Sequence, residues 1–292
     1  MPSIDDLIGS LALEPDGPDR VPADRYTVDR YTAGNVEAGT GVIFGGQLMA
    51  QAIVAALAGQ DGKRVKTLHT IFARGGRPDA PVEIAVERMH SGRAFASSTV
   101  TIGQGDRLCA RSLVLLSADE PDFIRHADSL PTAFPAVPGP DDGSAGDDRT
   151  GDWQVRIAGD VDINDPEAVG PPDLDVWTRF RGAPDDAAVD QALLAYATDG
   201  FLIATAMRPH AGVGQAQAHV TVSTGVVSHT LTFHEPAPAG EWLLLSHHSP
   251  YAGRGRSYGT AHVYRPDGTL VASYVQDAMI RPLAAGRAGT AL

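Results

Sequence analysis

One carboxylate, Asp199, stands out for the residues around it. It is the only charged side chain between Gln191 and Met207, in a helix-like run that also holds Leu194 and Phe201. A carboxylate in such an apolar helix is expected to be partly buried, which raises its pKa or requires a specific partner. An Asp of this kind can orient or deprotonate a water. The alternative is an ordinary Asp on the solvent side of the helix.

A second polar side chain, Gln276, lies in a strand-like run near the end of the sequence, beside Tyr274 and Val275. An amide both donates and accepts hydrogen bonds, so it can fix a water without changing protonation state. An exposed strand Gln fits the residues alone equally well. Together, Asp199 and Gln276 are the candidates for holding and activating a water.

Two glycines, Gly45 and Gly46, lead into an apolar segment that is free of charge. The first N–H groups of a helix are unpaired and lie at the positive end of its dipole, so they can hold a developing oxyanion. The alternative is that these glycines only permit close packing. His247 and His248 lack the spacing and the carboxylate of a metal site, so no metal is expected. Cys109 has no paired base nearby in the sequence and is predicted to be a small buried hydrophobe.

The elements that must position these residues repeat along the chain. Residues 46–57 and 187–207 are each predicted to be a helix, and each is followed by several strands. The predicted strands of the first half are 65–73, 82–90, 94–102 and 108–117, and those of the second are 219–222, 226–234, 242–249, 257–264 and 270–279. This order predicts an α+β fold in which an antiparallel sheet wraps around a helix, present twice in the chain.

The composition is that of a globular protein with room for two domains. The chain has 292 residues, of which 43% are hydrophobic and 20% charged. The stretch 119–152 is rich in Pro and Gly and holds nine acids and two arginines, which is −7 of the net charge of −13. We interpret it as a linker, with one unit at 1–118 (including an N-terminal extension) and a second at 153–292. A long loop within a single domain is the alternative.

The same numbers argue against several classes of partner and location. A net charge of −13 disfavours non-specific nucleic-acid binding, which needs a basic surface. No apolar run reaches the length of a membrane span, and the acidic N-terminus does not resemble a signal peptide. A single cysteine rules out a disulfide framework and fits the cytoplasm.

Three segments resemble the acyl-CoA thioesterase II family. The first is FGGQLMAQA at 44–52. The second is WTR at 177–179, followed by PDD at 184–186 and LAYATD at 194–199. The third joins His229, FHEP at 233–236 and WLL at 242–244 to VQD at 275–277. Their order and spacing extend the resemblance over residues from about 25 to 283.

This resemblance implies a double hotdog fold, with two helix-plus-antiparallel-sheet units in one chain. It implies fatty acyl-CoA as substrate, an activated water as nucleophile, and neither a cofactor nor a metal. It makes Asp199 the catalytic base or water-orienter and Gln276 a second orienter. A homo-oligomer is also expected.

The sequence departs from the family pattern at the third member of the site. The family has a Thr or Ser hydroxyl where this chain has Val226, and Ser228 lies where the family has Asp. In a regular strand, positions 226 and 228 point to one face about 7 Å apart. Ser228 is therefore predicted to supply the hydroxyl from a neighbouring position. The alternative is that Ser228 is structural and that the site has only two groups or is degenerate.

Two other functions compete with acyl-CoA hydrolysis. One is an enoyl-CoA hydratase of the hotdog type, which needs an Asp and a His from one loop–helix segment, a pair that the sequence lacks. The other is a non-catalytic acyl-CoA binding protein, which Val226 favours.

Overall fold

The structure, a computed structural model, describes residues 2–16, 21–23, 26–39, 41–128, 134–139, 151–159 and 161–283. The elements before residue 119 are α1 (Ile4–Ser10), β1 (Glu14–Pro15), β2 (Val21–Ala23), β3 (Tyr26–Ala33), α2 (Gly45–Leu57), β4 (Lys63–Phe72), β5 (Val82–Ser91), β6 (Phe95–Gln104) and β7 (Arg107–Ala118). Those after residue 152 are β8 (Trp153–Ile157), β9 (Asp173–Phe180), α3 (Ala187–Thr198), α4 (Leu202–Met207), the 3-10 helix η1 (Gln215–Gln217), β10 (Val222–Phe233), β11 (Leu243–Gly253), β12 (Arg256–Tyr264) and β13 (Leu270–Pro282).

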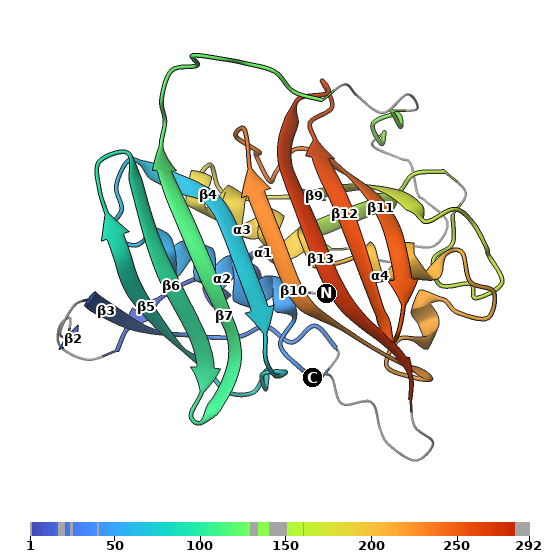
Figure 1. Cartoon of the computed structure of the whole chain (residues 1–292), viewed down its shortest axis with the longest axis horizontal. Helices are drawn as coiled ribbons and strands as arrows, with labels where there is room; N and C mark the ends of the chain where they lie inside the picture. The colour runs from blue at the N-terminus through green and yellow to red at the C-terminus, as the bar shows by residue number, and fades with distance from the viewer. Residues whose placement is uncertain are drawn as a thin grey trace.

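All of these strands belong to one antiparallel sheet. Its order is β1-β3-β5-β6-β7-β4-β10-β13-β12-β11-β9-β8, with β2 paired to β3. Each half has the same internal order, in which the second of its five main strands lies beside the fifth: β3-β5-β6-β7-β4 in the first half and β9-β11-β12-β13-β10 in the second. The equivalent strands β4 and β10 pair with each other and join the halves (Figure 1).

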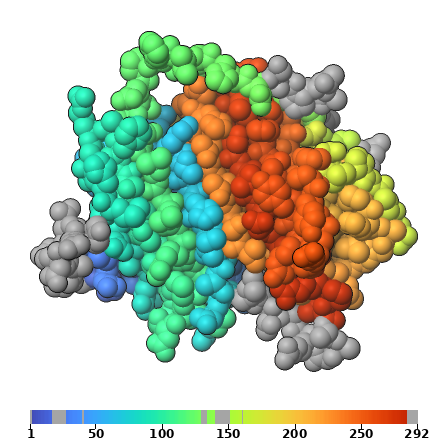
Figure 2. Space-filling view, viewed as in Figure 1, coloured from blue at the N-terminus to red at the C-terminus, as the bar shows by residue number. Residues whose placement is uncertain are grey.

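The long helices lie on the inner face of this sheet, where α2 and α3 pack against each other (Figure 1). Helix α2 carries no charged side chain, and Met49, Ala52 and Ile53 are fully buried. A helix without a charged face, whose two glutamines Gln47 and Gln51 are also buried, is stable only inside a core. Figure 2 shows the opposite, outer face of the sheet, with β4 (cyan) beside β10 (orange). The predicted α+β double hotdog is therefore confirmed.

Local sequence explains several element boundaries. Asp186 begins α3, where its side chain accepts hydrogen bonds from the N–H groups of Ala188 and Val189. Gly105 and Gly268 take positive φ angles of 56° and 86° in the hairpins β6–β7 and β12–β13, which places glycine at equivalent turns of the two halves.

Some predicted boundaries are wrong. The helix predicted over 187–207 is two helices, α3 and α4, interrupted at 199–201. The strands predicted at 219–222 and 226–234 are replaced by a single strand, β10. Strands β3, β8 and β9 were not predicted.

Two further expectations from the sequence, a linker at 119–152 and the lack of a membrane span, are compared here with the described residues. Of the predicted linker 119–152, residues 129–133 and 140–150 lie outside the described residues. Within the described ranges, no helix has the length and apolar character required to cross a membrane.

Candidate active site

Asp199 lies at the break between α3 and α4. It is the C-cap of α3, and two residues later Phe201 has a φ of 72°, a left-handed conformation that a bulky residue rarely adopts. This turn ends α3, so the helix is not continuous as the sequence predicts. Backbone strain of this kind clusters at functional sites. The break places the Asp199 carboxylate against the N-terminus of α2, which comes from the other half of the chain.

The contact between Asp199 and α2 is a hydrogen bond. The backbone N–H of Gly46 donates to Oδ2 of Asp199 over 2.9 Å. A Cβ at Gly45 would lie 2.7 Å from the same Oδ2, and a Cβ at Gly46 would lie 2.4 Å from the carbonyl oxygen of Tyr196. These distances are shorter than van der Waals contact, so both positions require glycine if α2 is to begin this close to the end of α3.

Burial gives Asp199 an unusual pKa. Removal from solvent raises its pKa from 3.8 to about 7, although the hydrogen bond from Gly46 acts in the opposite direction. Its second oxygen, Oδ1, is buried and has no hydrogen-bond partner among the described residues. A carboxyl that titrates near neutral pH, with one oxygen unpaired, is suited to take a proton from a water.

Gln276 lies beside Asp199, as required if the two side chains hold one water together. It belongs to β13 and is 2% exposed. Its Nε2 donates to the backbone oxygen of Asp199 over 3.5 Å and to Nδ1 of His229 over 3.4 Å. Its Oε1 is buried without a partner among the described residues. The structure therefore brings together Asp199 and Gln276, with one unpaired acceptor on each.

Ser228 does not join this group. Its hydroxyl donates to Asp277 Oδ2 over 2.9 Å on the exposed outer face of the sheet. The expected same-face geometry is wrong because β10 has a bulge: Val226 pairs with Ala278 and Ser228 with Asp277, which leaves Val227 as an extra residue. The extra residue reverses the alternation, so Val226 faces the pocket and Ser228 faces away from it.

The two glycines of α2 differ in what their N–H groups do. Because the N–H of Gly46 binds Asp199, it is not available to an oxyanion. The N–H of Gly45 makes no hydrogen bond with any residue in the described part of the chain, and Gly45 lines the pocket. Of the two predicted oxyanion donors, only Gly45 is placed to act.

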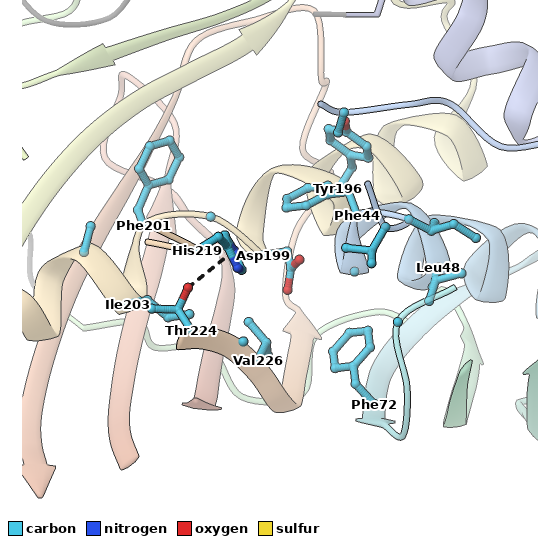
Figure 3. Close-up of a pocket in the computed structure, with 18 of the residues that line it drawn as sticks. Phe44, Leu48, Phe72, Tyr196, Asp199, Phe201, Ile203, His219, Thr224 and Val226 are labelled. Carbon is cyan, nitrogen blue, oxygen red and sulfur yellow. Dashed lines mark hydrogen bonds between the residues drawn. The ribbon is translucent and has the colours of Figure 1, made fainter. Parts of the chain in front are cut away.

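A cavity of about 440 Å³ opens at Asp199. Figure 3 shows its apolar wall, to which both halves of the chain contribute, with Asp199 at the centre. The apolar side chains of this wall include those of Phe44, Leu48, Phe72, Ile203 and Val226.

Polar groups at this cavity are few. Among the lining residues of the described chain, Asp199 is the one carboxylate and Arg74 the one side chain that is always cationic. Thr224 and His219 form a pair in which Oγ1 and Nε2 are 3.4 Å apart (Figure 3). Such a cavity, apolar with a few convergent polar groups, is typical of a small-molecule site.

His229 is a buried residue of the site that belongs to the third family-like segment but to which the sequence assigned no catalytic role. It is 0% exposed, and burial lowers its pKa to about 3, with a smaller effect from His69. Its neighbours are Gln276, Thr198 and the ring of Tyr274. The sequence signal for it is its place in the third family-like segment, one residue after Ser228, but the bulge that turns it inward is not visible in the sequence.

Fold and site together define a double hotdog protein whose two halves jointly form an apolar pocket around a buried carboxylate. Residues 32–117 match the model of the acyl-CoA thioesterase N-terminal domain, and residues 124–280 match that of the C-terminal domain. The chain belongs to the acyl-CoA thioesterase family.

Individual relatives agree with this assignment. Acyl-coenzyme A thioesterase 8 of Mus musculus is 29% identical over 264 residues, which covers 82% of this chain and 80% of that protein. The crystal structure of acyl-CoA thioesterase II TesB2 from Mycobacterium marinum has a TM-score of 0.73 at 24% identity and covers 96% of this chain and 99% of that one. A hot dog fold protein of Alicyclobacillus acidocaldarius has a TM-score of 0.71 at 18% identity, with coverage of 95% and 98%. At these identities the two structures support the fold.

Proposed function

We propose that this chain hydrolyses fatty acyl-CoA thioesters to a free fatty acid and CoA, with a water activated by Asp199 as the nucleophile. The observation that carries the proposal is a pair of buried acceptors without partners among the described residues, Oδ1 of Asp199 and Oε1 of Gln276. Asp199 lines the apolar pocket, and Gln276 contacts the backbone oxygen of Asp199. Buried acceptors almost always have a donor, and water is the donor that hydrolysis requires. Membership of the acyl-CoA thioesterase family supports the same chemistry.

The proposed water donates one proton to each acceptor. Both of its O–H bonds are then engaged by Asp199 and Gln276, and a lone pair remains to attack the thioester carbonyl. Solvent scarcely touches either acceptor in this conformation. We therefore propose that a rotation of the Asp199 carboxylate, which lines the pocket, admits the water.

The reaction then balances as follows. The water oxygen bonds to the carbonyl carbon while its proton passes to Asp199, and the carbonyl electrons move onto oxygen. The N–H of Gly45, at the start of α2, stabilises that oxyanion. The oxyanion re-forms the carbonyl, the carbon–sulfur bond breaks, and the thiolate of CoA receives the proton from Asp199. The products are the fatty acid and the CoA thiol, and Asp199 is ionised again.

The pocket supports an acyl chain as the group next to the thioester. Its wall is apolar at Phe44, Leu48 and Phe72 on one side and at Ile203 and Val226 on the other. Burial of methylene groups against such a wall contributes roughly 0.8 kcal/mol each. A role in fatty acid metabolism follows from this substrate class.

Four further properties are part of the proposal. The domain division is 1–118, 119–152 and 153–292. A cytoplasmic location is supported by the single, buried Cys109. Homo-oligomerisation is supported by apolar side chains on the outer face of the sheet, of which Ile71 is 48%, Leu113 51% and Leu115 39% exposed. The acidic net charge supports a protein without nucleic-acid or membrane partners.

Release of CoA from a panel of acyl-CoAs, followed with a thiol reagent, tests the function. Hydrolysis should appear with saturated substrates and should be lost in Asp199→Asn. Loss of enoyl absorbance without release of thiol would instead identify a hydratase. Saturable binding without turnover across the panel would identify a binding protein.

A further inference from the structure

A chain of buried hydrogen bonds runs behind Gln276. The hydroxyl of Thr198 donates to the carbonyl oxygen of Ala195 over 2.9 Å and lies 3.2 Å from Nε2 of His229. On the other side of the imidazole, Nδ1 of His229 lies 3.4 Å from Nε2 of Gln276. Thr198 and His229 are 0% exposed and Gln276 is 2% exposed, so water does not compete for these bonds.

The hydrogen-bond directions are assigned from the shorter contact of the Thr198 hydroxyl. Its single proton lies on the 2.9 Å bond to the carbonyl of Ala195, which can only accept, and Thr198 then accepts from Nε2 of His229, 3.2 Å away. Nε2 of His229 therefore carries the imidazole proton, and Nδ1 has a lone pair. That lone pair accepts an N–H of Gln276. Burial keeps the imidazole neutral because it lowers the pKa of His229 to about 3.

The amide orientation of Gln276 depends on this tautomer. Its second N–H points to the backbone oxygen of Asp199, 3.5 Å away, which is also an acceptor only. Both amide protons are thus engaged, and Oε1 is the one polar atom of this side chain that has no partner among the described residues. A flipped amide would set its oxygen against two acceptors, which is a repulsive arrangement.

We propose that Thr198 and His229 are positioning residues that hold the Gln276 amide with its oxygen free to accept a proton from the nucleophilic water. This inference rests on the proposed function and deepens it. With the opposite orientation, the NH₂ group would donate to one of the two lone pairs of the water and leave one of its O–H bonds without an acceptor, which makes the water a weaker nucleophile. The tautomer of His229 therefore controls how well the held water is oriented for attack.

The imidazole is itself held in place. Its ring stacks on Tyr274 with centroids 5.3 Å apart and planes 21° apart. The hydroxyl of Tyr274 is 2.6 Å from Nε2 of His247, whose Nδ1 donates to the carbonyl of Leu174. These contacts fix the position of the ring but not which of its nitrogens carries the proton. Among the described contacts, the tautomer is selected directly by the hydroxyl of Thr198 and, through the amide of Gln276, by the backbone oxygen of Asp199.

The decisive experiment compares Thr198→Val with Thr198→Ser in the full chain. The valine keeps the shape but removes the acceptor for Nε2–H, so kcat should fall by about tenfold, the effect of one lost buried hydrogen bond, with KM unchanged. The serine should keep the wild-type kcat. Thr205→Val is the matched control, because the Thr205 hydroxyl is equally buried but, within the described part of the chain, bonds only to the carbonyl of Phe201.

Two further measurements separate positioning from a general effect on the core. The ¹⁵N NMR signals of His229 should show protonation at Nε2 in the wild type and a mixture of tautomers in Thr198→Val. In a double-mutant cycle, Thr198→Val should have no further effect on kcat in a Gln276→Leu background, because it acts through that amide.

Several results would overturn the proposal. They are a wild-type kcat in Thr198→Val, an equal loss in Thr205→Val, or a proton on Nδ1 of His229 in the wild type. If Asp199→Asn is inactive while Thr198→Val is normal, the positioning role fails and the proposed hydrolysis stands. If Asp199→Asn keeps normal turnover, the proposed mechanism itself fails. NMR of the wild type decides the tautomer even if a variant does not fold.

Discussion

Replacing the Asp199 carboxylate by an amide should stop turnover and at the same time stabilise the fold near neutral pH. Asn keeps the oxygen that accepts from Gly46, so the contact between α2 and α3 survives. It removes the base, and kcat should fall by at least ~100-fold. Asp190→Asn is the matched control on the same helix, because Asp190 binds the N–H of Ala239 and lies outside the pocket. It should keep its kcat.

The stability gain follows from the pKa of Asp199. Burial raises that pKa from 3.8 to about 7, so the folded protein holds the proton more tightly than the unfolded chain does. This proton stabilises the fold below pH 3.8, and the contribution is lost as the pH rises through about 7. At pH 8 the ionised carboxylate costs roughly 4 kcal/mol, from three pH units at about 1.4 kcal/mol each. Because Asp199 is partly exposed to the pocket, screening by water lowers this cost to roughly 2–3 kcal/mol.

Urea unfolding at pH 5, 6, 7 and 8 measures this difference directly. The free energy of unfolding of Asp199→Asn should exceed that of the wild type by an amount that increases as the pH rises to about 7. Above that pH the difference should stay constant. The kcat/KM of the wild type should rise over the same range, because the base acts when it is ionised. A variant no more stable than the wild type at pH 8, or a gain that is equal at all four pH values, would refute this account of Asp199.

Three further substitutions test individual contacts. Gly46→Ala should destabilise the fold by roughly 1–3 kcal/mol in thermal or urea unfolding, because its Cβ would lie 2.4 Å from the Tyr196 carbonyl oxygen; an unchanged midpoint would contradict the close approach of the two helices. Val226→Thr should raise kcat or leave it unchanged, because it places a hydroxyl on the pocket wall; a large loss of kcat in a folded variant would show that the apolar side chain is needed. Ser228→Ala should leave kcat/KM unchanged, because that hydroxyl bonds to Asp277 on the outer face; a clear loss would return Ser228 to the mechanism.

Much of the fold was predictable because its signals are local. The alternation of apolar residues located most strands, and the repeated order of helix and strands predicted two similar units. Strand β9 was missed although its WTR segment was recognised, because a strand covered on both faces lacks a clear alternation. The isolation of Asp199 among apolar residues was also a local signal, and the structure shows the buried carboxylate that it predicted.

Other features of the site depend on contacts between distant segments. The hydrogen bond from Gly46 to Asp199 joins residues 153 positions apart, and it excludes Gly46 as an oxyanion donor. His229 acquires its position through Thr198 and Gln276, which are 31 and 47 positions away. The residues around Gly46, Asp199 and His229 in the sequence contain no pattern that predicts these long-range hydrogen bonds.

The bulge in β10 is a feature of the site that the sequence by itself does not determine. Composition and order determined that β10 is a strand and that it carries Val226 and Ser228. Which face each side chain takes was decided by pairing with β13, where Val226 meets Ala278 and Ser228 meets Asp277. The face of a strand residue depends on hydrogen-bond register with its partner, and a single extra residue reverses it. Register is a property of two strands that meet only in the tertiary structure.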